Sequence, residues 1–167
     1  MDLYPWIVFL HVAAILLFFI AHGTSMAVGF RLRRERDPAR IRALLDLSSW
    51  ALGVWPSVAF LVGLLAGIAV GIVGGWFGQA WIWISLALLV VVSGAMTPLV
   101  AARLNAVRAA AGTRAINPFS RKPPEPPPDQ NEAELQRLLA AWDPRPAAVM
   151  GFGGFVIILW LMFFKPF

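Results

Sequence analysis

The chain contains two histidines, His11 and His22, and both lie in the long apolar stretch that begins at Trp6. Imidazole can relay a proton, bind a metal ion or bind haem iron, so these residues are the strongest candidates for chemistry. Their separation of 11 residues places them on one face of a helix, about 16 Å apart along its axis. The same face holds mostly small or polar residues, which are Ala14, Phe18, Ser25 and Gly29. We therefore expect this face to point into a helical bundle.

Three roles are open for the two histidines. In the first, each ring hydrogen-bonds a serine, a threonine or a free carbonyl group on a neighbouring helix. In the second, one or both bind haem or a metal ion, with haem b or copper as the cofactor and His11 as the metal ligand. In the third, the two rings are titratable groups at different depths on a path for protons or small solutes.

The methionines limit which haem sites the chain can build. Two histidines about 16 Å apart cannot bind one iron, and the later apolar stretches contain no further histidine. A haem would be five-coordinate or would take a methionine as its second axial ligand. The methionines considered are Met26, Met96, Met150 and Met162. The proton path is less favoured, because the middles of the later stretches contain no Asp, Glu, Lys or Arg.

The composition indicates that lipid surrounds most of the chain. Hydrophobic residues make up 59% of the 167 residues and charged residues 14%, whereas a soluble domain is about half apolar and about a quarter charged. The absence of cysteine excludes disulfides, thiolate metal sites and thiol catalysis. The net charge is +5, but the sequence contains no module that reads a DNA groove or stacks on bases. We therefore expect no binding to nucleic acid.

Four apolar stretches have the length of membrane-spanning helices. Each reaches or approaches the ~20 residues that cross the hydrocarbon layer, and the stretches are 4–30, 49–73, 80–102 and 147–164. Continuous rather than alternating apolarity favours helices over barrel strands. The predicted fold is therefore all-α: residues 1–167 form a single integral membrane domain, a four-transmembrane-helix bundle with short amphipathic cytoplasmic helices.

The basic residues predict the orientation in the membrane. Of the 14 lysines and arginines, all except Lys165 lie between the first and second spans or between the third and fourth. The segment 74–79 between the second and third spans carries no charge. The positive-inside rule then places both basic loops in the cytoplasm. We expect a multi-pass protein of the bacterial inner membrane with both termini on the periplasmic side.

The basic loops contain helical signals around a proline-rich linker at 117–130. Asp37 and Pro38 are typical of a helix start. The apolar face of this first short helix is predicted to consist of Ile41, Leu44, Leu45 and Ser48. The third span should continue to about Gly112. A last short helix is predicted with one face formed by Leu135, Leu138, Leu139 and Trp142.

Small residues recur every four positions along the second span, at Ala59, Gly63, Gly67 and Gly71. Such a ridge lets a neighbouring helix approach closely in lipid, either within the chain or at the seam of a homodimer. Pro56 and Pro98 lie within the second and third stretches, and each is predicted to bend its helix because it lacks a backbone donor.

Three segments resemble a family of bacterial predicted integral membrane proteins of unknown function. They read FLHVAAILLFFIAHG, RLRRERDPARIRALLDLS and ILWLMFFKPF. The Leu10–His11–Val12 start is also similar, more distantly, to the four-helix units of copper-resistance D proteins and HemJ-type protoporphyrinogen oxidases. That resemblance implies a role for His11 in binding metal or haem.

These patterns predict a non-enzymatic inner-membrane protein, either an accessory subunit or a structural bundle. Catalysis is not expected, because the apolar stretches contain no carboxylate pair, nucleophile elbow or phosphate loop. The expected partners are the lipid bilayer and either a second copy or a larger membrane complex. The alternative is a haem- or copper-binding redox or transport component that uses a histidine of the first span.

Overall fold

The computed structural model describes residues 2–117 and 126–167, except for the side chain of Thr97, and no strand occurs among them. These described residues form seven α-helices, a 3₁₀ turn (η1) and a π-helical turn (η2). Their bounds are α1 Tyr4–Leu32, α2 Pro38–Ala51, α3 Val54–Val73, η1 Trp76–Gly78, α4 Ala80–Met96, η2 Thr97–Ala101, α5 Ala102–Ala110, α6 Glu132–Ala141 and α7 Arg145–Phe164. The all-α prediction is confirmed for these residues.

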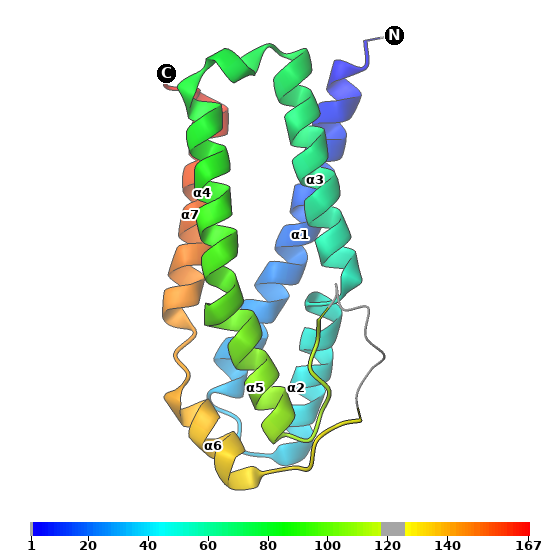
Figure 1. Cartoon of the computed structure of the whole chain (residues 1–167), viewed down its shortest axis with the longest axis vertical. Coiled ribbons are helices and arrows are strands. Elements are labelled where there is room, and N and C mark those ends of the chain that lie inside the picture. The colour runs from blue at the N-terminus through cyan, green and yellow to red at the C-terminus, as the bar shows by residue number, and fades with distance from the viewer. Residues whose placement is uncertain (1, 118–125) are drawn as a thin grey trace.

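Within the described part of the chain, four helical rods are long and apolar enough to cross a membrane, as the sequence predicts. They are α1, α2 with α3, α4 with η2 and α5, and α7. Both termini lie at one end of the rods, together with η1 (Figure 1). We call the opposite end, which holds the α1–α2 turn, α5 and α6, the basic end. Its residues include most of the arginines.

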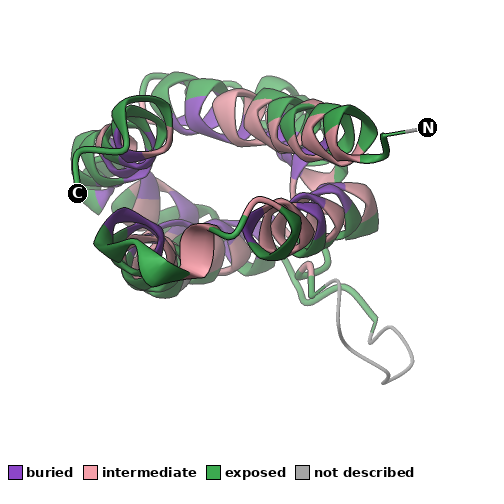
Figure 2. Ribbon diagram, turned by 90° about the horizontal axis from the view of Figure 1, so that it is seen from above, coloured by how far each residue is buried: buried purple, intermediate pink, exposed green. Residues whose placement is uncertain are grey.

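The rods associate as two pairs. Helix α1 packs along α3, and α4 packs along α7, as Figures 1 and 2 show. Exposed residues cover the outward faces of the helices and buried residues the inward faces (Figure 2). Many of the exposed side chains are large and apolar, for example Phe9, Leu65, Val90 and Leu159.

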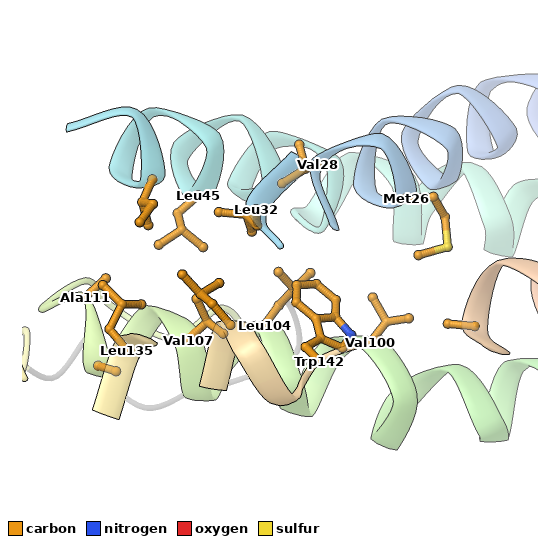
Figure 3. Close-up of a cluster of buried hydrophobic side chains, with 14 residues drawn as sticks. Met26, Val28, Leu32, Leu45, Val100, Leu104, Val107, Ala111, Leu135 and Trp142 are labelled. Carbon is orange, nitrogen blue, oxygen red and sulfur yellow. The ribbon is translucent and has the colours of Figure 1, made fainter. Parts of the chain in front are cut away.

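The basic end contains a hydrophobic core of buried side chains, which we call the basic-end core. Side chains from α1 and α2 meet those from α5 and α6 there (Figure 3). Its residues include Leu32, Ile41, Leu45, Leu104, Leu135 and Leu139, all with at most 1% exposure. Helix α7 has 20 residues, whereas the other rods have 29, 36 and 31. Helix α6 lies at the basic end of α7 (Figure 1), and it supplies the fourth helix of this layer.

Local signals explain where α2 and α6 begin. The Asp37 carboxylate accepts a hydrogen bond from the Ala39 backbone N–H at 2.9 Å, and the Asn131 side chain accepts one from the Glu134 N–H at 3.0 Å. Both are N-cap bonds that satisfy donors at a helix start. On the predicted apolar faces of the two short helices, Leu44 and Leu138 are partly buried. Buried on them are Ile41, Leu45, Ser48, Leu135, Leu139 and Trp142.

A carboxylate stabilises the turn between α1 and α2. Glu35 accepts hydrogen bonds from the backbone N–H groups of Arg36, at 3.1 Å, and Asp37, at 3.3 Å. These two bonds, together with the positive charges of Arg40 and Arg31, hold the pKa of the Glu35 carboxyl below its ordinary value. The turn therefore keeps a charged acceptor among arginines.

The two prolines act differently from each other. Helix α2 ends at Ala51, and α3 starts after Gly53, so Pro56 lies in the first turn of α3. A first-turn N–H has no partner within its helix, so Pro56 removes no hydrogen bond from α3. The rod is interrupted at residues 52–53, directly before Pro56. Pro98 lies in the π-helical turn η2, where the wider turn accommodates the missing donor. The third rod continues through α5 to Ala110 and ends close to Gly112, as predicted. Gly112 has a φ of +70°.

The proline-rich linker is only partly described. Residues 117 and 126–130 have no regular secondary structure. The rest of the predicted linker, 118–125, lies outside the described residues.

Candidate functional site

The two histidines belong to α1, which is helical without interruption from Tyr4 to Leu32. They contact different helices. His11 lies against α3, and the His22 ring lies against α7. The structure therefore does not bring them together. Two separate sites, one for each ring, are the candidates.

The His11 site is a close contact between a ring and a helix backbone. Nδ1 of His11 lies 2.7 Å from the carbonyl oxygen of Gly63. Because a carbonyl can only accept, Nδ1 must donate, and in the neutral ring Nε2 then carries the lone pair. The ring also lies over Gly67, where an added Cβ would come within 2.8 Å of Nδ1 and Cε1. Only glycine at position 67 allows this approach without a shift of the ring.

The small-residue ridge of the second span lies partly under α1. A Cβ on Gly63 would meet the Ile15 side chain at 2.8 Å, and Gly67 faces His11. Ala59 is buried. Gly71, near the end of α3, faces Phe77 and Ile82 instead of α1. The ridge is thus occupied by neighbouring elements of the same chain.

The His22 site is surrounded by aromatic rings. Phe18, one turn earlier on α1, stacks on the imidazole with 6.1 Å between ring centroids. From α7, Phe152 meets it edge-on at 5.2 Å and Phe155 at 6.3 Å. These rings exclude water from one side of the imidazole. They leave few polar groups with which it could pair.

The Nε2 atom of His22 is buried and has no hydrogen-bond partner among the described residues. A buried polar atom without a partner is uncommon and costs free energy. An added Cβ on Gly151 would lie 2.6 Å from this Nε2 and 3.6 Å from the sulfur of Met96. The nitrogen and the sulfur are therefore no more than about 6 Å apart.

Two further buried polar atoms, on or beside the part of α1 that follows His22, also lack partners. The hydroxyl of Ser25, one turn after His22, is buried without a hydrogen bond among the described residues, and so is the indole nitrogen of Trp142. Thr24, by contrast, donates to the carbonyl of Ile20 within its own helix at 2.8 Å. The expected hydrogen bond from a histidine to a serine or threonine is therefore absent at His22 within the described part of the chain.

Conventional metal clusters do not occur in the part of the chain that the structure describes. No three His, Cys, Asp or Glu side chains gather there closely enough to hold a metal ion. A metal ion bound by His22 would have to take further side-chain ligands from other residue types, and methionine sulfur is one of them. Sequence reasoning named Met96 among four methionines, but it could not select it, because the choice depends on how α4 and α7 lie against α1.

Comparison with protein-family models, with curated proteins and with solved structures finds no match to this chain. The likeness to a family of membrane proteins of unknown function therefore remains a prediction from three segments of sequence. The more distant likeness to copper-resistance D and HemJ-type proteins remains a prediction from Leu10–His11–Val12 alone.

Proposed function

We propose that the protein is a non-enzymatic, multi-pass protein of the bacterial inner membrane, an accessory or structural bundle whose basic end faces the cytoplasm. One observation carries the proposal: exposed apolar side chains cover the rods, while the arginine-rich end has a water-excluding core. At 1.5 Å per residue, the 20 residues of α7 span about 30 Å, the thickness of the hydrocarbon layer. The other rods exceed that length, and their excess forms the basic end.

In this proposal the basic-end core is a small soluble layer on the cytoplasmic face. Its helices α2 and α6 are amphipathic and cytoplasmic, and both chain termini are periplasmic. The exposed apolar faces of the spans contact lipid, a second copy of the chain or another membrane protein. Nucleic acid is not a partner.

Single cysteines test this orientation, because the chain has no cysteine of its own. Ala39→Cys lies at the start of α2, and Gln79→Cys follows η1; both positions are exposed. In intact bacterial cells, a membrane-impermeant maleimide is expected to label Gln79→Cys and to leave Ala39→Cys unlabelled. Permeabilised cells should give equal labelling. Labelling of Ala39→Cys alone in intact cells would reverse the proposed orientation.

A second candidate function is a haem- or copper-binding redox or transport component that uses His11. The hydrogen bond from Nδ1 to the Gly63 carbonyl favours it. Metal-binding histidines commonly donate their second nitrogen to a carbonyl group, which fixes the ring and leaves Nε2 for the metal. Such a site would bind haem through one histidine, with a methionine or no protein group as the second axial ligand.

Optical spectra test the second candidate. A haem protein purified in detergent would show a Soret band, and His11→Ala is expected to abolish it while His22→Ala leaves it in place. Copper would be detected by elemental analysis of the same samples. Colourless, metal-free protein from haem- and copper-replete cells would exclude the second candidate and leave the first.

A further inference from the structure

The His22 site combines one imidazole nitrogen with nearby thioether sulfur. Nε2 of His22 and the sulfur of Met96 both border the space that Gly151 leaves free. Metal–ligand bonds of about 2.0 Å to nitrogen and about 2.3 Å to sulfur would require these atoms to lie within about 4.3 Å of each other. Methionine has three rotatable side-chain bonds and adapts its position readily. The remaining shift is therefore within reach of the Met96 side chain.

A third donor lies on α1 itself. Met26 follows His22 by four residues, so the two side chains lie on the same face of the helix. Met26 is 2% exposed, and its side chain points from α1 into the bundle (Figure 3). Met96 packs against the cluster that contains Met26. Met26 of α1 is therefore the candidate for a third ligand beside His22 of α1 and Met96 of α4.

This donor set selects a soft, monovalent metal ion. Thioether and imidazole ligands suit Cu(I), whereas Mg²⁺ and Ca²⁺ require oxygen ligands. The apolar segments of the four rods contain no carboxylate that could balance a divalent charge. Moving a divalent ion from water into this site would also cost more free energy than moving a monovalent one.

We propose that His22 and Met96, with Met26 as the third ligand, form a site for one Cu(I) ion inside the bundle. Metal binding would give the buried Nε2 the partner that it lacks. The site is distinct from His11 and goes beyond the bundle role proposed above.

Competition with a chromophoric Cu(I) chelator tests the site in the full-length protein, purified metal-free in detergent under anaerobic, reducing conditions. We expect one Cu(I) per chain. Met96→Leu keeps the size of the side chain but removes the sulfur, and it is expected to weaken binding at least about tenfold. His22→Asn is expected to abolish binding. The matched control is Met162→Leu, since Met162 packs near Trp81 and Leu161 in a separate cluster, and it should bind as the unchanged protein does.

X-ray absorption at the copper edge gives a second measurement that does not depend on affinity. The spectrum should show both nitrogen and sulfur ligands, with less sulfur in Met96→Leu and no change in Met162→Leu. The proposal is overturned if the unchanged protein binds no Cu(I), or if Met96→Leu matches it in both affinity and sulfur coordination. Because the cysteine-labelling pattern does not involve copper, its result separates a failure of this proposal from a failure of the proposed orientation.

Discussion

Replacement of Trp142 by alanine is expected to destabilise the protein by about 3–5 kcal/mol, the range found when a large buried aromatic side chain is removed. Trp142 is 2% exposed and lies between α6 and α7. Its ring lies against Gly29 on α1, where an added Cβ would lie 3.2 Å from the indole. The alanine variant would leave a cavity at the point where the basic-end core meets the spans. Unfolding in mixed micelles with a denaturing detergent would measure the loss.

The matched control for this variant is Trp6→Ala. Trp6 lies near the start of α1 and is 67% exposed, so removing it creates no cavity and should change the unfolding free energy by less than about 1 kcal/mol. Hydrogen exchange should show the loss of protection in α5 and α6 for Trp142→Ala. Equal stability of the two variants would show that the basic end is not a packed layer.

The helices and their faces could be predicted because each depends on signals within a few residues. Asp37 followed by Pro38 starts α2 where the sequence indicates, and the apolar spacing of Leu135 and Leu139 identifies the buried face of α6. The break before α3 was missed. An apolar stretch without charge gives no periodic signal at Gly53, and Pro56 was therefore assigned to the interior of a helix rather than to its first turn.

Arg108 shows why charge alone does not reveal a residue's position. The sequence counts it among the basic residues of a loop, but it is 2% exposed. Its Nη2 donates hydrogen bonds to the Leu45 carbonyl and to the Ser48 hydroxyl, so it joins α5 to α2. The one available signal was Ser48, a polar residue on the predicted apolar face of α2. Its partner could not be identified, because it lies 60 residues away.

The histidines illustrate the same limit in the spans. Helical spacing places them on one side of α1, and that expectation depends only on the geometry of a single helix. Their different neighbours follow from the tertiary arrangement: α3 runs beside α1 at His11, while α7 reaches it at His22. The closeness of Met96 to His22 is set by the packing of α1, α4 and α7 around Gly151, which both side chains approach. Spacing within one helix cannot predict such packing.

The second large effect is expected from Gly154→Leu, which should separate α7 from α4. A Cβ at this position would come within 2.5 Å of Cγ2 of Val92, and Val92 is itself buried. A β-branched side chain has little rotational freedom in a helix, so Val92 cannot easily move aside. Overpacking of this kind lowers the free energy of unfolding by about 1–3 kcal/mol. Because leucine adds more than a Cβ, we expect a loss at the upper end of this range. The unfolding free energy in mixed micelles would measure it.

The same substitution one residue earlier provides the control. Apart from its chain neighbours and the backbone of its own helix, no described atom lies within 4 Å of a Cβ built on Gly153, so Gly153→Leu meets open space. Both variants gain the same helix propensity, about 0.8 kcal/mol relative to glycine, and any difference between them therefore measures the contact with Val92. We expect Gly153→Leu to be neutral or slightly stabilising. If both variants were equally stable, α4 and α7 could not be packed through Gly154, and the pairing of the rods would have to be different.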